Sequence, residues 1–296
     1  MTQDPVRVFI GSGEASLLER KTLIYSLRKN SRRPVEVYVL NGTHNAVEPD
    51  AGPPFAAPMS LRVKYRNYTE FSLYRFLIPQ LCNHRGRGIY LDSDMVCLGD
   101  IGELFDLPMD GCDFLSVRAY DTNRWGPSVM LIDCDRCRFD LEQICDETDA
   151  GLYSYTEFTQ FDDRYLARHP QKIGVLDPNW NVFDRCDEQT KLIHYTNLLS
   201  QPWKFPGHPH GELWFQYFRE AQAAGQITDA DIAKSIGRGY VRPTIQQGNQ
   251  QPPPPVAAVA PAPVRSPPPA IENPAPLRRP NWLKRLSRKL RGKPAA

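Results

Sequence analysis

The sequence predicts an α/β fold, a single domain built on a mostly parallel mixed sheet. The first reason is a strand, a glycine loop, a helix and a second strand over residues 6–40, the pattern of parallel strands joined by a right-handed crossover. The second is the apolar run Ile89–Leu91, which ends in two carboxylates, Asp92 and Asp94. The third is that short strand-like runs and helical patterns continue as far as residue 245.

Each element is expected from its residue pattern. Short runs rich in β-branched and aromatic residues predict strands, here at residues 6–10, 35–40, 61–65, 89–91, 114–117, 129–133, 172–176 and 191–195. Apolar residues at helical spacing predict helices, here at 14–30, 71–79, 100–105, 141–149, 158–169 and 212–224. Thr228 and Asp231 have the spacing of a capping box at the start of one more short helix. Residues 43–60 are rich in Pro, Ala and Gly and predict a loop.

Composition indicates a globular protein without a disulfide framework. The 296 residues are 41% hydrophobic and 24% charged, with no run of 18 apolar residues that could span a membrane. The polar start of the chain argues against a signal peptide. Seven cysteines at irregular spacing argue for a reducing compartment, and Cys134-x-x-Cys137 lacks the second pair that a zinc site needs. The expected location is the cytoplasm.

The charge distribution separates the end of the chain from the rest. From Gln246 onward the chain has nine Lys or Arg and one acid, a charge of +8, so the net charge of +2 leaves −6 for the remainder. An acidic body is a poor nucleic-acid binder, so no nucleic-acid partner is expected. Thirteen of the 28 prolines lie in residues 251–296. We expect a domain at residues 1–245, a disordered proline-rich linker at 246–280 and a basic amphipathic segment at 281–296.

The basic C-terminal segment has one apolar face. Leu283, Leu286 and Leu290 share that face, and Lys and Arg residues lie on the other side. This pattern suits contact of residues 281–292 with an anionic membrane surface, here the inner face of a membrane. The alternatives are a solvated basic tail and a segment that docks on an acidic partner.

Asp92 and Asp94 form the first candidate site. On an extended chain residues i and i+2 point the same way, so both carboxylates can converge just beyond the strand, where open α/β sheets bind ligands. Two such oxygen donors suit Mg²⁺ or Mn²⁺, with substrate phosphate completing the coordination. The alternative is a pair of carboxylates that only caps a turn.

Two other features fit a phosphate ligand. Gly11-Ser12-Gly13 precedes a helix, whose first N–H groups can bind a nucleotide. Its spacing matches neither a dinucleotide fingerprint nor a phosphate loop, so a plain turn is the alternative. Arg75 lies in the apolar segment 71–79, where burial of its charge is costly unless it meets an anion, either a ligand or a structural carboxylate.

In their order along the chain, several motifs resemble the family 8 glycosyltransferases, which include glycogenins and bacterial lipopolysaccharide glucosyl- and galactosyltransferases. The motifs are FSLYRF at 71–76, IYLDSDMV at 89–96, GDIxxL at 99–104, VMLID at 129–133, LxPxWN at 176–181, HYT at 194–196 and QPW at 201–203. The resemblance covers residues 6–205. It implies a GT-A fold and transfer of a hexose, with retention, from a UDP-sugar donor to a glycan, lipid-linked or protein acceptor. It also implies Mn²⁺, or Mg²⁺ in its place, as cofactor.

The resemblance assigns roles to individual residues. The implied metal ligands are Asp92, Asp94 and His194. The implied nucleotide-sugar-binding residues are Gly11, Ser12, Glu14, Arg75, Asp92 and Lys204. The catalytic region maps ambiguously onto Gln160, Asp162 and Asp163, one of which would lie beside the anomeric carbon. Whether a carboxylate nucleophile or a same-face internal return is used stays open.

Two motifs depart from the family pattern. Gly126-Pro127-Ser128 stands where the family has Asn-Ser-Gly, a segment that helps to shape the sugar pocket, so the donor sugar is open. Gln201 replaces the lysine of a Lys-Pro-Trp motif, and Lys204 could contact phosphate from nearby.

Two alternatives to this function follow from the same residues. A phosphatase of the haloacid dehalogenase type would use Asp92 as nucleophile and Asp94 as general acid, but that class places the motif on its first strand. The altered motifs also fit a transferase-like protein that binds a nucleotide-sugar or a partner without turnover.

Overall fold

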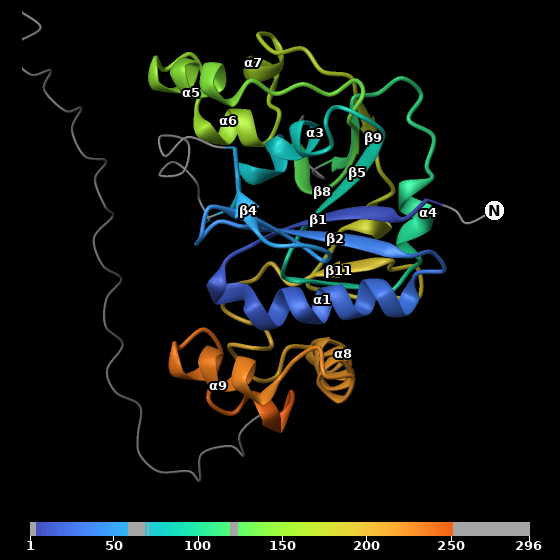
Figure 1. Cartoon of the computed structure of the whole chain (residues 1–296), viewed down its shortest axis with the longest axis vertical. Helices are drawn as coiled ribbons and strands as arrows, with labels where there is room; N and C mark the ends of the chain where they lie inside the picture. The colour runs from blue at the N-terminus through green and yellow to red at the C-terminus, as the bar shows by residue number, and fades with distance from the viewer. Residues whose placement is uncertain (1–3, 59–68, 70, 119–123, 251–296) are drawn as a thin grey trace, which may run out of the picture. The chain divides into compact units, whose positions relative to one another are not determined.

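The computed structural model describes residues 4–58, 69, 71–118 and 124–250. Contacts within the chain separate residues 1–252 from residues 253–296. The predicted strand at 61–65, most of the predicted linker and the basic segment 281–296 lie outside the described residues. The architecture below is therefore that of the first unit (Figure 1).

A large mixed sheet forms the centre of this unit. Its strands, in sequence order, are β1 (Val6–Ser12), β2 (Val35–Asn41), β3 (Ala46–Pro49), β4 (Phe55–Ala56), β5 (Arg87–Asp92), β7 (Phe114–Arg118), β8 (Trp125–Asp133) and β9 (Ile173–Val175). Their spatial order is β4-β3-β2-β1-β5-β8-β7-β9. The pairs β1–β2, β1–β5 and β7–β9 are parallel and the other four are antiparallel. The predicted α/β class is confirmed, with the parallel pairs β2-β1-β5 in the middle of the sheet.

A second, small sheet extends the edge where β5 ends. It consists of β10 (Val182–Phe183), β11 (Leu192–His194) and β6 (Met95–Cys97), in that order. β6 follows β5 after a two-residue turn, and β11 pairs with it antiparallel. This pairing returns a distant part of the chain to the end of β5.

The helices are mostly short. They are η1 (Glu14–Ser16), α1 (Leu17–Asn30), η2 (Tyr74–Leu77), α3 (Ile78–Leu81), α4 (Ile101–Phe105), α5 (Leu141–Asp149), α6 (Tyr155–Thr159), α7 (Asp163–Leu166), η3 (Pro178–Trp180), α8 (Gly211–Ala223), α9 (Asp229–Gly237) and η4 (Ile245–Gln247). Among the residues described, none of these helices is long and apolar enough to cross a membrane.

Alternation along the strands divides the core into two layers. Val8 and Ile10 of β1 point to the face covered by α1, whereas Phe9 points to the opposite face. On β5, Tyr90 belongs to the same layer as Phe9. Figure 1 shows α1 along one side of the sheet and α3, α5, α6 and α7 on the other. Burial of apolar surface on both faces is the main favourable term that holds these layers together.

A third apolar cluster packs α8 and α9 against α1 and the small sheet. It includes Trp203, Trp214 and Phe218, and the rings of Trp214 and Phe218 are stacked at 5.2 Å. The predicted capping box is confirmed: Thr228 accepts from the backbone N–H of Asp231, whose carboxylate accepts from Thr228 N–H. Asp100 caps α4 in a similar way by accepting from Gly102 N–H.

Three predictions of local structure were wrong. Residues 43–60 are not only loop, because β3 and β4 add two antiparallel strands to the sheet edge. The predicted helix at 71–79 is a 3-10 turn, η2, followed by the four residues of α3. The predicted helix at 158–169 is two helices, because Phe161 between them has a φ of 50°. Phe161 is fully buried, so tertiary packing outweighs its helical propensity.

Candidate functional site

The candidate site lies at the carboxyl end of the central parallel strands. β1 and β5 run parallel with Gly11 beside Asp92, so the loop after β1 and the acidic turn after β5 meet at one edge. His194 ends β11 opposite Met95 of β6. Residues from three parts of the chain therefore lie together.

Asp92, Asp94 and His194 form a group that can hold a metal ion. One ligand atom from each lies within 4.8 Å of the others. His194 Nε2 lies 3.0 Å from Asp94 Oδ1. Two carboxylates and an imidazole suit a divalent cation, and the identity of that cation is not fixed by this donor set. Among the described residues, this is the one group in which three or more His, Cys, Asp or Glu side chains converge in this way.

A chain of polar contacts orients His194. Its Nδ1 lies 3.1 Å from Asn181 Oδ1, and Asn181 Nδ2 donates to Ser128 Oγ at 2.9 Å. When the amide oxygen accepts from Nδ1–H, Nε2 keeps its lone pair for a metal. Asn181 is in a motif noted above, but its role could not be read from the sequence.

Arg75 and Tyr90 hold the carboxylate of Asp92. Tyr90 Oη donates to Asp92 Oδ1 at 2.6 Å, and Arg75 Nη2 donates to the same oxygen at 3.4 Å. Arg75 also donates to the carbonyl oxygens of Ser72 and Pro127 and lies over the Tyr90 ring, 4.5 Å from its centroid. The anion that compensates the buried guanidinium is therefore Asp92 itself. Tyr90 could have been found from the i, i+2 rule, because it shares a face with Asp92.

The absence of a side chain at Gly11 makes room for this arrangement. A Cβ there would lie 2.2 Å from Tyr90 Oη and 2.6 Å from Phe71 Cδ2. Neither distance is compatible with van der Waals contact. Gly11 therefore permits the Tyr90 hydroxyl to reach Asp92, and it acts through packing at this position.

Burial and charge shift the acid–base properties of the group in known directions. Burial raises the pKa of Asp92, although Arg75 and His194 act to lower it. Burial lowers the pKa of His194, but the carboxylates of Asp94 and Asp92 outweigh it and raise the pKa above its usual value. A bound cation would reverse both preferences and favour the charged carboxylate and the neutral imidazole.

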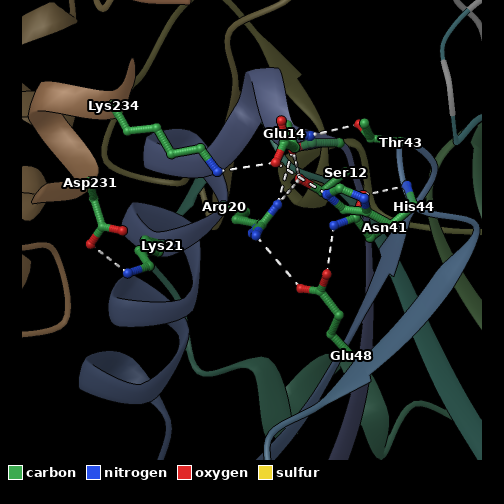
Figure 2. A network of polar contacts seen from close by, with 11 residues as sticks. Ser12, Glu14, Arg20, Lys21, Asn41, Thr43, His44, Glu48, Asp231 and Lys234 are labelled. Carbon is green, nitrogen blue, oxygen red and sulfur yellow. Dashed lines mark hydrogen bonds and ion pairs between the residues drawn. The ribbon is translucent and has the colours of Figure 1, made fainter. Parts of the chain in front are cut away.

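A polar network surrounds the loop that follows β1 (Figure 2). Glu14 Oε1 accepts from Lys234 Nζ of α9 at 3.0 Å and lies 3.1 Å from His44 Nε2. The Glu14 backbone N–H donates to Thr43 Oγ1 at 2.9 Å. Ser12 is fully buried, and its hydroxyl accepts from Arg20 Nη1 at 3.4 Å. The predicted nucleotide loop is thus held by side chains from β2–β3, α1 and α9.

Gln201, Lys204 and Glu19 lie around the other side of Asp94. Gln201 Nε2 donates to the Tyr195 carbonyl at 3.0 Å and reaches Asp94 Oδ2 at 3.4 Å. Lys204 is exposed. Glu19 on α1 is 3% exposed, and its Oε2 has no hydrogen-bond partner among the described residues. Burial raises the pKa of Glu19 to about 8, with Lys204 acting to lower it. No sequence pattern had singled out Glu19.

A pocket of about 790 Å³ opens beside the metal group. Its described lining comes from η2, β7, β8, α6 and β10: Ser72, Arg75, Val117, Arg118, Arg124, Trp125, Gly126, Pro127, Ser128, Tyr155, Thr159, Gln160, Asn181, Val182, Phe183 and Arg185. Arg75 and Asn181 belong both to this lining and to the contacts of the metal group. The pocket volume is that of a site for a small ligand.

The three residues of the predicted catalytic region are separated in the structure. Gln160 caps the end of α6 and lines the pocket, and its buried Oε1 has no partner among the described residues. Asp162 is the N-cap of α7, where it accepts from Arg164 N–H and pairs with Arg124 at 3.4 Å. Asp163 is exposed in the first turn of α7. Gln160 is the member of this set that faces the pocket.

Comparison with known proteins agrees with this architecture. Residues 17–137 match the model of glycosyl transferase family 8. Protein CDI of Arabidopsis thaliana is 25% identical over 256 residues, which are 78% of this chain and 92% of that protein.

Three solved structures show the same fold. They are apo WbbM, a bifunctional glycosyltransferase (TM-score 0.53, 16% identity, 79% of this chain and 52% of that chain), GlyE of Streptococcus pneumoniae TIGR4 (0.53, 15%, 83% and 66%) and galactosyltransferase LgtC with donor and acceptor sugar analogues (0.53, 11%, 75% and 100%). The chain spans about half of the WbbM chain and about two thirds of GlyE.

The mixed sheet, together with these neighbours, shows that the protein has the fold of the GT-A glycosyltransferases. Within that class, the resemblance to family 8 that the motifs predicted is confirmed by the match over residues 17–137. The Asp92 motif follows β5 and not the first strand, which does not fit the phosphatase alternative.

Proposed function

We propose that the protein is a retaining hexosyltransferase that uses a UDP-sugar donor and a divalent cation, Mn²⁺ or Mg²⁺. The acceptor is a glycan, a lipid-linked glycan or a protein. The observation that carries this proposal is the convergence of Asp92, Asp94 and His194 within 4.8 Å beside a pocket of about 790 Å³.

The donor diphosphate is proposed to lie between the metal group and the loop after β1. A divalent cation at Asp92, Asp94 and His194 would supply positive charge to the leaving diphosphate. The chain's own contribution is to fix these three ligands, through Asn181 behind His194 and through Tyr90 behind Asp92. Gly11, Ser12 and Glu14 are proposed to line the uridine side, where Ser12 accepts from Arg20 of α1 and Glu14 accepts from Lys234 of α9.

Arg75 and Lys204 are the cations proposed to act on the donor. Arg75 is buried at one wall of the pocket, where its guanidinium faces both Asp92 and the lining. Lys204 is exposed next to Gln201, so its long side chain is available for phosphate. The side-chain amide of Gln201 contacts Asp94, so it helps to orient the carboxylate of this proposed metal ligand.

Gln160 is the residue that we propose lies beside the anomeric carbon. It lines the pocket, and its Oε1 is buried without a partner among the described residues, which is costly unless a ligand supplies a donor. A solved structure of LgtC is described as an active-site mutant in which a glutamine is replaced by glutamate. Asp162 and Asp163 are proposed to shape the turn that presents Gln160.

Thermal unfolding with nucleotides tests the donor site. A ligand present at about 100 times its Kd stabilises the folded protein by about 2.7 kcal/mol, which is a shift of several degrees in Tm. We expect Mn²⁺ with UDP to raise Tm more than Mn²⁺ with GDP, ADP or CMP. Asp94→Ala should abolish the shift, and Glu142→Gln on α5 is the matched control that should retain it.

The outcomes separate the candidate functions. Failure of every nucleotide to shift Tm would overturn the donor site. A UDP shift without release of UDP from any UDP-hexose, with or without acceptors, would favour the binding protein without turnover. UDP release that follows the same metal and Asp94 dependence would support the transferase.

The cellular location of the protein is proposed from the basic C-terminal segment. We propose that the protein works in the cytoplasm at the inner face of a membrane. The segment proposed to contact the membrane, residues 281–292, lies outside the described residues. Sedimentation of the full chain with anionic vesicles, compared with a chain that ends at residue 280, tests that contact.

A further inference from the structure

The charged side chains that the described part of the chain contributes to the pocket lining are all of one sign. Among its described residues there are four arginines and no aspartate or glutamate: Arg75, Arg118, Arg124 and Arg185. Arg75 is buried and compensated by Asp92. The other three come from the end of β7, the residue before β8 and the segment after β10. Three separate parts of the chain thus bring positive charge to one opening.

The three outer arginines differ in their surroundings. Arg124 pairs with Asp162 at 3.4 Å and is 44% exposed, while the guanidinium of Arg118 lies 5.7 Å from the centre of the Trp125 ring. Arg185 is exposed and makes no ion pair with any described residue. Residues 119–123 lie outside the described residues, so the site is defined without them.

The carboxylates nearest to Arg185 in sequence are held by other groups. Asp184 accepts from Thr196 Oγ1 at 2.6 Å and from the Asn197 backbone N–H. Asp187 accepts from Thr190 Oγ1 and from the Gln189 backbone N–H. The pKa of Asp187 is lowered chiefly by its hydrogen bond with Thr190, and the charge of Arg185 contributes least. A weakly compensated positive charge is therefore left at the mouth of the pocket.

Flat and apolar surface lies between these charges. Trp125, Pro127 and Tyr155 line the pocket. Phe183 also belongs to the lining, and 52% of its surface is exposed. Aromatic faces of this kind bind either the apolar face of a sugar ring or an alkyl chain. A guanidinium beside them recognises phosphate or carboxylate through two parallel hydrogen bonds.

We propose that the acceptor which enters this pocket carries an anionic group, a phosphate or a carboxylate, next to a sugar ring or an alkyl chain. Arg185 and Arg118 bind the anionic group at the mouth, and Trp125 and Phe183 contact the adjoining ring or chain. This inference rests on the proposed function, because it takes the pocket to be the acceptor side of a transferase site. It selects charged acceptors over their neutral counterparts.

Matched pairs of small probes test the charge of the acceptor. The pairs are methyl glucoside with its 6-phosphate, and 1-octanol with octyl phosphate, each titrated into the full chain with UDP and Mg²⁺ present and followed by ligand-observed NMR. We expect each phosphate to bind about tenfold more tightly than its neutral partner. A preference for the sugar phosphate or for octyl phosphate distinguishes an anionic glycan from a lipid phosphate.

Three variants locate the effect. Arg185→Gln and Arg118→Gln should each lower the affinity for the phosphate probe by about threefold to tenfold. Arg85 is an exposed arginine that precedes β5, at the end of this strand opposite to Asp92. Arg85→Gln should leave the affinity for the phosphate probe unchanged. Equal binding of neutral and charged probes, no binding of either phosphate, or an equal loss in all three variants would overturn the proposal. The UDP-dependent Tm shift, measured on the same samples, and a repeat titration without nucleotide show separately whether the donor site has failed.

Discussion

Substitution of Gly11 offers a direct check on the packing behind the acidic turn. The added methyl group of Gly11→Ala would lie 2.2 Å from Tyr90 Oη, so the hydroxyl must move by roughly 1 Å to reach ordinary contact. Overpacking of this kind costs about 1–3 kcal/mol. Loss of the hydrogen bond to the Asp92 carboxylate adds about 1.5–3 kcal/mol. We expect a decrease of about 2.5–6 kcal/mol in the free energy of unfolding, a large part of the stability of an ordinary domain.

A double-mutant cycle in urea tests the cause. Tyr90→Phe removes the clashing oxygen and leaves Cζ at 3.0 Å from the added methyl carbon, although Phe71 remains close. Gly11→Ala with Tyr90→Phe should therefore cost less than the sum of the single changes, by about 1 kcal/mol or more. Gly237→Ala, where no atom lies within 4 Å of the added carbon, is the control and should not destabilise. Additive costs would refute the placement of the Tyr90 hydroxyl.

Three further changes probe other parts of the structure. Glu19 has a pKa raised from 4.5 to about 8, so the folded state keeps its proton and loses stability as pH rises through that range. Glu19→Gln should gain stability relative to wild type over the same interval, by at most about 5 kcal/mol, and a constant difference in urea unfolding from pH 5 to 9 would contradict this. Asn181→Ala should weaken Mn²⁺ binding about 10- to 100-fold by freeing His194, as measured by the EPR signal of free Mn²⁺, whereas unchanged binding would show that the contact has no such role. Thr228→Ala should cost about 1 kcal/mol in urea unfolding by removing the cap of α9, and no cost would mean that Asp231 alone completes the cap.

The sequence allowed the central elements to be predicted because their patterns are strong. β1, α1, β2 and β5 combine apolar runs with glycine turns or helical spacing, and each was expected close to its observed bounds. The missed strands, β3 and β4, are short and lie at the sheet edge. Edge strands of this length bury little surface, so their residues carry no alternation to detect.

The proposed metal ligands could be predicted from the sequence, but the residues that orient these ligands could not. Asp92 and Asp94 follow a strand at a spacing with direct meaning on an extended chain. Asn181 and Ser128 support His194 through contacts across 13 and 53 residues of sequence, which no local pattern reveals. The break between α6 and α7 has a similar origin, because the positive φ of Phe161 follows from its burial against distant aromatic rings.

The ion pairs between α9 and the start of the chain bear on how the protein matures during synthesis. Lys234 and Glu14 are separated by 220 residues, and Lys21 and Asp231 by 210. At about 5–20 residues per second, a ribosome needs roughly 10–40 s to make the intervening chain. For that time the loop after β1 lacks the helix that holds its outer side (Figure 2). A nascent chain therefore completes this wall of the candidate site only after nearly all of the body has been made, and a product truncated before α9 would expose an unfinished loop to cellular proteases.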